Sequence, residues 1–107
     1  MGDDLPRNYS SKAAEKFCAI SGATALYGFT VSNANAATRY VLLFDLEVLP
    51  ADGSVPVAPY AIATVSDKET AWIPPRRMDR GIVLAASTTQ NTLTLAAAEH
   101  IFDVQYV

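Results

Sequence analysis

The stretch that decides the fold is LYGFTVSNANAATRYVLLFDL, residues 26–46. In its first part, Tyr27, Phe29 and Val31 alternate with small or polar residues, which is the two-residue period of a strand with one buried face. We therefore predict that these three side chains lie in the core. An Asn- and Ala-rich loop over residues 33–38 follows, since Asn tolerates left-handed backbone angles at little cost.

The second part, RYVLLFDL at residues 39–46, is apolar on both alternating faces. One face carries Tyr40, Leu42 and Phe44, and the other carries Val41 and Leu43. The pattern alone also allows a helix, but the aromatic neighbours and the nearby Pro50 favour a strand. A strand that is apolar on both faces needs cover from both sides. We expect one face in the core and the other against a second subunit.

The rest of the chain alternates short apolar runs with turn signals about every ten residues, which is typical of a sandwich or barrel. Further strands are predicted at residues 17–20, 60–65, 69–73, 81–87, 91–96 and 100–107. Pro50-Ala51-Asp52-Gly53 forms a turn, Pro74-Pro75 ends the strand before it, and residues 81–96 form a hairpin. Short helices at 11–17 and 96–100 remain alternatives. The prediction is an all-β, single-domain antiparallel β-sandwich of about eight short strands, either jelly-roll or Ig-like.

Composition sets limits on the partners of the chain. It has 107 residues, of which 50% are hydrophobic and only 18% charged, with a net charge of -3. Such a length allows one core, and the shortage of charge suggests that a partner covers part of the surface. The acidic balance argues against nucleic acid. The polar start and the lack of a long apolar run predict no membrane segment and no leader, in a protein made in the host cytoplasm.

The first twelve residues are too polar to pack by themselves. We therefore divide the chain into an extended N-terminal arm, residues 1–12, and a β-sandwich domain, residues 13–107. The arm is expected to be disordered or to lie on a neighbouring chain. In the second case Leu5, Arg7 and Tyr9 are its candidate contacts, because burial of Leu5 and Tyr9 would offset the entropy lost on ordering.

Catalytic patterns are weak in this sequence. A single histidine, His100, lies between Glu99 and Asp103, and the chain has no GxSxG nucleophile elbow. In a strand His100 and Asp103 face opposite sides, so the three are interpreted as solvated surface groups. The lone Cys18 is interpreted as a small buried residue. We predict no enzyme, no metal and no cofactor.

Two groups of residues are candidate binding sites. Arg76, Arg77 and Arg80 cluster in PPRRMDRG and could grip an acidic surface on a partner, although arginines in a loop are more often only solvated. Tyr60 and Trp72 could form a platform on which a sugar stacks, although aromatic residues at the edge of a sandwich are more often part of its core.

Four segments resemble a group of small β-sandwich modules encoded in the virion gene clusters of tailed bacteriophages. They are LYGFTVSNANAATRYVLLFD at residues 26–45, LPADGSVPV at 49–57, GIVLAASTT at 81–89 and FDVQYV at 102–107. The resemblance extends over residues 16–107, and its motifs are structural rather than catalytic. It implies a virion structural protein, with capsid decoration as the expected role.

Two functions therefore stand as hypotheses. The first is a capsid decoration, or cement, protein on the capsid surface of the virion, which binds and stabilises the major capsid protein, as a homo-oligomer (trimer or dimer). The second is a receptor- or glycan-binding module of a phage head or tail fibre that uses Tyr60, Trp72 and the arginines. Because both would share one fold, the fold cannot choose between them.

Overall fold

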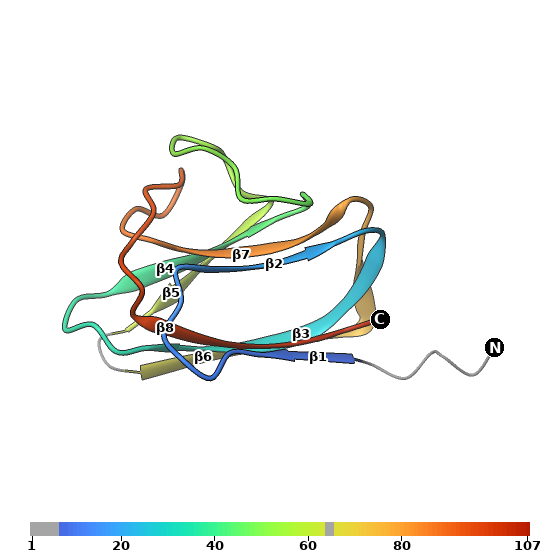
Figure 1. Cartoon of the computed structure of the whole chain (residues 1–107), viewed down its shortest axis with the longest axis horizontal. Coiled ribbons are helices and arrows are strands. Elements are labelled where there is room, and N and C mark those ends of the chain that lie inside the picture. Colours follow the sequence, from blue (N-terminus) through green and yellow to red (C-terminus); the bar gives the residue numbers. More distant parts are fainter. Residues whose placement is uncertain (1–6, 64–65) are drawn as a thin grey trace.

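The computed structural model describes residues 7–63 and 66–107 and places their strands in two antiparallel sheets, the two layers in Figure 1. The first sheet has the strand order β1-β8-β3-β6 and the second has β2-β7-β4-β5. The strands are β1 (Arg7–Ser10), β2 (Phe17–Ser21), β3 (Thr24–Asn33), β4 (Arg39–Phe44), β5 (Ala58–Ile62), β6 (Ser66–Met78), β7 (Gly81–Ser87) and β8 (His100–Tyr106). The predicted all-β sandwich is confirmed.

The strand order identifies the sandwich as a jelly roll. Strands β1 and β8 pair with each other, as do β2 with β7, β3 with β6, and β4 with β5. This is a long hairpin wrapped over two sheets, and only the β4–β5 connection stays within one sheet. Eight strands in this order form the double-sheet jelly roll, whereas an Ig-like sandwich would divide its strands differently.

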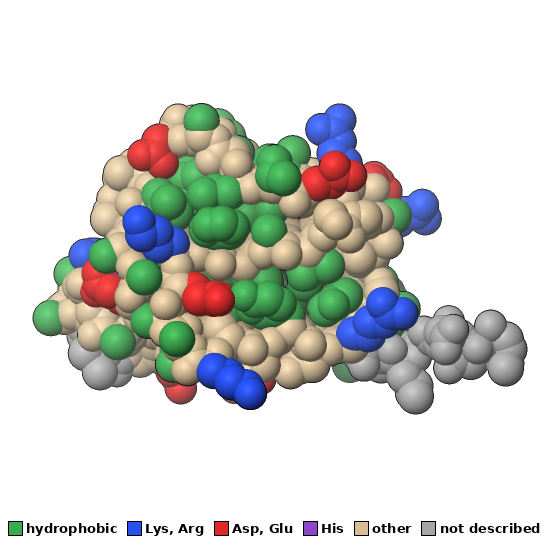
Figure 2. Space-filling view, viewed as in Figure 1, with side chains coloured by type: hydrophobic (Ala, Val, Ile, Leu, Met, Phe, Trp, Pro, Cys, Tyr) green, Lys and Arg blue, Asp and Glu red, His purple; other side chains and the backbone are tan. Residues whose placement is uncertain are grey.

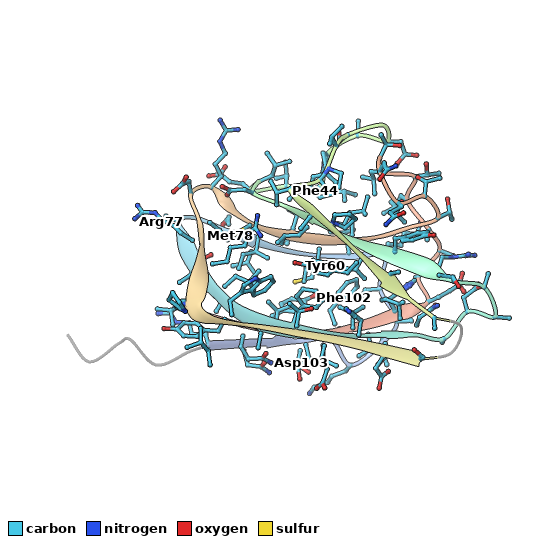
Figure 3. All side chains as sticks on the ribbon, turned by 180° about the vertical axis from the view of Figure 1, so that it is seen from behind. Phe44, Tyr60, Arg77, Met78, Phe102 and Asp103 are labelled. Carbon is cyan, nitrogen blue, oxygen red and sulfur yellow. The ribbon has the colours of Figure 1, made fainter. Side chains whose placement is uncertain are left out.

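The main core lies between the sheets and is built from the inward faces of both. It contains Phe29 and Val31 from β3 and Phe102 from β8, packed against Val41 and Leu43 of β4. Figure 3 shows Phe102 and Tyr60 in the space between the layers. The alternating pattern of the sequence therefore locates this core correctly, because each of these strands has one face toward the other sheet.

Tyr27 departs from the predicted alternation. The pairing of β3 with both neighbours shifts between Leu26 and Gly28, so Tyr27 is the extra residue of a bulge. A bulge reverses which residues face inward. Leu26 is fully buried and Tyr27 only half-buried, so the prediction of a core Tyr27 is wrong.

Three other segments differ from expectation. Strand β6 continues through Pro74 and Pro75 to Met78, since an edge strand tolerates residues that cannot donate a hydrogen bond. The predicted strand at 91–96 is a loop with one bridge, between Ser87 and Leu95. Arg7–Ser10 takes its place as the eighth strand. Neither predicted helix alternative, at 11–17 or 96–100, is helical, and none of the described residues forms a helix long and apolar enough to span a membrane.

The outer face of the second sheet is buried by the chain itself. Leu42 and Phe44 of β4, with Val83 and Ala85 of β7, pack against Leu93 from the β7–β8 loop. Tyr40, Leu46, Leu49 and Leu95 are partly buried against this second cluster. The apolar pattern of β4 therefore did predict cover on both faces, but the expectation that a second subunit supplies it is wrong, because two loops supply it.

Candidate functional site

The loop of residues 45–57 between β4 and β5, named here the valine loop, projects from the second sheet (top of Figure 1). Val48, Val55 and Val57 are 71%, 74% and 51% exposed on it. Leu46 and Leu49 of the same loop point the other way, into the second cluster. The loop therefore has an anchored inner side and an apolar outer side.

Hydrogen bonds fix the middle of the valine loop, at Asp52, Gly53 and Ser54. The Gly53 N–H donates to the carbonyl of Leu93 (2.7 Å), and the Leu93 N–H donates to the carbonyl of Ser54 (2.9 Å). The N–H of Leu95 donates to the Asp52 carboxylate (3.1 Å). These bonds tie residues 52–54 to the β7–β8 loop, directly before Val55, while Leu46 and Leu49 anchor the part around Val48 by packing into the second cluster.

Asp45 anchors the start of the valine loop to the β6–β7 turn. Its carboxylate accepts hydrogen bonds from the N–H groups of Asp79 (3.1 Å), Arg80 (2.8 Å) and Gly81 (3.3 Å). Burial by itself raises the pKa of Asp45, but these three bonds and the charge of Arg80 outweigh it, so the pKa of Asp45 lies below its ordinary value.

The predicted arm contacts fall in different environments. Leu5 lies outside the described residues. Arg7 and Tyr9 belong to β1, which pairs with β8 of the same chain, so this part of the arm is neither disordered nor laid on a neighbour. The Tyr9 hydroxyl donates to Glu15 (2.8 Å), and burial together with this bond raises the pKa of Tyr9 to about 12. Tyr9 is thus engaged within its own chain.

The two predicted platform aromatics pack together with Phe29. Tyr60 meets the Phe29 ring edge to face at 5.1 Å between centroids, and Trp72 lies 6.1 Å from Phe29 and 6.4 Å from Tyr60. Both residues are partly buried against the main core. They form an aromatic cluster rather than a flat exposed platform, because Tyr60 and Trp72 meet edge to face and both pack against Phe29.

The three arginines do not converge on one point. Arg76 and Arg77 are successive residues of β6 and so point to opposite faces. Arg77 is highly exposed (Figure 3) and pairs with Asp79 at 3.1 Å, whereas Arg80 is exposed on the turn after β6. Arg76 is half-buried near Tyr60, whose pKa is raised by burial and lowered in part by the charge of Arg76.

His100 and Cys18, the two side chains most often used in catalysis, are both buried. His100 is 0% exposed, and neither of its ring nitrogens has a hydrogen-bond partner, so its interpretation as a solvated group is wrong. Burial lowers the pKa of His100, while Glu99 and Arg39 act in opposite directions. Cys18 is buried as predicted, and burial raises its pKa to about 12. Neither group is open to a substrate in solution.

The outer face of the first sheet carries a shallow groove beside the β3 bulge. Tyr27, Thr30, Glu69 and Gln105 are among the residues that line it, and Gly28 forms part of its floor. Its polar side chains beside the Tyr27 ring suit a hydroxyl-rich ligand. Across residues 7–63 and 66–107, no group of three or more His, Cys, Asp or Glu side chains could hold a metal ion.

Sequence reasoning missed both the exposed valines and the groove. Val55 and Val57 flank Pro56 shortly after a strong turn, and this pattern predicts an irregular exposed segment. It does not predict which side chains of the segment point outward. The groove lies beside the bulge at Tyr27. In the sequence this segment has the regular alternation of a strand without a bulge, so the alternation does not predict the groove.

Comparisons with known proteins add little to this description. No model of a known protein family matches the chain, and a comparison with curated protein sequences gives no match either. Among solved structures, the chain is similar to the coat protein of Tobacco streak virus, with 11% identity over 97% of this chain and 88% of that chain, at a TM-score of 0.35. A TM-score this low assigns neither fold nor function, so the jelly-roll assignment rests on the strand order.

Proposed function

We propose that this protein is a virion structural protein, and specifically a capsid decoration protein of a tailed bacteriophage that binds the major capsid protein through the valine loop. The single observation that carries the proposal is the set of three exposed valines on a loop fixed by hydrogen bonds. An apolar surface that is already ordered loses less conformational entropy on binding than a flexible one, so its burial contributes more to affinity.

The fold and the resemblance support the same proposal. Jelly rolls occur in viral capsid proteins and in lectin domains, so the fold is compatible with both a capsid protein and a glycan-binding module. The resemblance of four segments to phage virion modules favours the capsid. Two of these segments, residues 49–57 and 81–89, contribute to the valine loop and to the covered outer face beneath it. Arg77 and Arg80, which are exposed at the end of β6 and on the turn after it, remain predicted partner contacts.

Binding to capsids tests the proposal directly. The double variant Val48→Ser, Val55→Ser should bind heads that lack this protein at least tenfold more weakly than the wild type, as measured by co-sedimentation. The matched control is Ile101→Ser, which changes a 45% exposed side chain on the outer face of the first sheet and should leave binding unchanged. Equal binding by the folded double variant and the wild type would overturn the role of the loop.

A second candidate function is recognition of a glycan on a host receptor. The groove beside Tyr27 favours it, because Thr30, Glu69 and Gln105 present polar groups next to an aromatic ring. In this case the wild type should bind a glycan on an array. Tyr27→Ala should abolish this binding, whereas Trp72→Ala should retain it. Retention of the signal in Tyr27→Ala would count against the groove.

A further inference from the structure

The four edge strands of the sandwich differ in how they are protected from other chains. Exposed edges attract strands from other molecules, and proteins usually guard them with charge, proline or short length. Edge β6 carries Asp67, Lys68 and Glu69 near its start, and edge β5 contains Pro59. Edge β1 has four residues and carries Arg7. Edge β2, with the sequence FCAIS, has neither charge nor proline.

The free side of β2 presents three residues whose backbone can still pair. The Lys16 carbonyl accepts a hydrogen bond from Ala86, and the N–H of Gly22 donates to Arg80, so both of these residues face β7. In an antiparallel ladder, alternate residues face the same neighbour. The N–H and C=O groups of Phe17, Ala19 and Ser21 therefore point toward the open edge.

Two of the outward-facing side chains of β2, Phe17 and Ala19, are apolar. Phe17 is 37% exposed and sits opposite Ala85 of β7, while Ala19 sits opposite Val83, so both lie on the face of the second sheet that carries the second cluster. Phe17 and Ala19 also line a groove along this edge, together with Tyr9, Glu15, Lys16 and Ala98. Figure 2 views this side of the molecule and shows hydrophobic side chains gathered there in two areas.

We propose that β2 pairs with β2 of a second copy, antiparallel about a twofold axis at Ala19. In this register Ala19 faces Ala19, and Phe17 faces Ser21 in both directions. Each of these three residue pairs can exchange two hydrogen bonds, so the register uses every outward backbone group of the strand. The pairing joins two second sheets into one continuous sheet of two copies. This inference goes beyond the proposed function and does not rest on it.

The chemistry of the edge favours a second copy as the occupant. A twofold interface places the same surface on both partners, so any charge near the axis would meet itself. FCAIS has no charge, and Lys16 falls opposite the uncharged Gly22 of the other copy in this register. The bulky Phe17 faces the small Ser21, which leaves room for the ring beside the axis.

Two variants test the pairing. Ala19→Lys places two like charges at the axis, and Ala19→Pro removes an N–H that points away from β7, so neither breaks the bonds between β2 and β7. Analytical ultracentrifugation of the purified full chain should show a monomer–dimer equilibrium, with a dissociation constant that rises at least tenfold in each variant. The matched control Ala61→Lys, on the exposed edge strand β5, should dimerise like the wild type.

Other outcomes would overturn the proposal. A wild type that stays monomeric at every concentration would do so, as would a dimer that persists in folded Ala19→Lys and Ala19→Pro. A monomeric wild type whose binding to heads is lost in both variants would show that β2 takes a strand from another protein. Because the valine-loop variants are scored by binding to heads and these by dimerisation, the two proposals can fail separately.

Discussion

The two sheets differ in what covers their outer faces. Over the second sheet, the valine loop and the β7–β8 loop bury Leu42, Phe44 and Val83. Over the first sheet, residues such as Thr30 and Asp103 are only partly buried and carry polar groups, and Figure 3 shows Asp103 outside the layers. An apolar outer face therefore need not be a subunit interface, because loops of the same chain can complete a second small core.

The largest effect should come from opening the covered face. Leu93→Ala removes a fully buried side chain that the second cluster packs around, and such a cavity costs about 2–5 kcal/mol of unfolding free energy. The matched change Ile101→Ala, on the open face of the first sheet, should cost about 1 kcal/mol or less, because this side chain is 45% exposed. Urea unfolding measures both. An equal loss of unfolding free energy in Leu93→Ala and Ile101→Ala would show that the outer faces of the two sheets do not differ in burial.

Leu93 and Tyr27 illustrate how far the sequence could predict this structure. Alternation placed most core residues correctly, since each strand has one face toward the other sheet, and it also showed that β4 is buried on both sides. It could not identify the covering element, because residues 91–96 alternate like a strand although they form a loop that delivers Leu93. Nor could it locate the bulge at Tyr27, which depends on pairing with two other strands.

The candidate sites were harder to predict than the core. The sequence marked Tyr60 and Trp72 correctly as edge aromatics that could belong to the core, but their packing on Phe29 is a contact between distant segments. The arginines are neighbours in sequence, yet the strand pleat and the turn separate them. The exposure of Val48 and Val55 depends on how the loop is tied to Leu93 and, through Asp45, to the β6–β7 turn, and no local sequence pattern shows these contacts.

A smaller effect is expected at one tight position of the open face. A Cβ atom added at Gly28 would lie 2.6 Å from the backbone oxygen of Thr70 and 3.2 Å from the Cα of Ala71. Backbone atoms move less easily than side chains, so Gly28→Ala should cost about 1–3 kcal/mol of unfolding free energy. Thermal unfolding measures this, and an unchanged stability would show that β3 and β6 can separate locally at the bulge.

The anchor of the valine loop should contribute about 1–2 kcal/mol. Asp45→Asn keeps the shape but loses the charge that strengthens three hydrogen bonds, and it turns an amide donor toward a backbone donor. Hydrogen exchange should then show faster opening of residues 45–57. Unchanged hydrogen exchange of residues 45–57 in Asp45→Asn would contradict this anchoring role of Asp45.

The same carboxylate predicts a pH dependence. Because the pKa of Asp45 in the folded chain lies below its ordinary value of 3.8, its contribution is fully present above pH 3.8. The contribution is then lost as the pH falls through the lower folded pKa. The difference in unfolding free energy between wild type and Asp45→Asn should shrink over this acid range. A difference that stays constant down to pH 2 would contradict the assignment.

The smallest effect is expected on the exposed polar surface of the first sheet. Thr30→Val keeps the branched shape and removes only a long hydrogen bond to Glu69 (3.4 Å) on the solvent side. The unfolding free energy should change by less than about 0.5 kcal/mol. A larger loss would mean that this face is covered in solution, and it would move the search for a partner to the first sheet.

Thiol labelling at residue 85 tests most directly whether the chain covers its own second sheet. In a Cys18→Ala background, Ala85→Cys places a thiol in the second cluster, under Leu93. At concentrations where ultracentrifugation finds only single molecules, we expect this thiol to react no faster than global unfolding allows. Rapid labelling of the folded single molecule, suppressed only when the protein is bound to heads, would show that the cover comes from another chain.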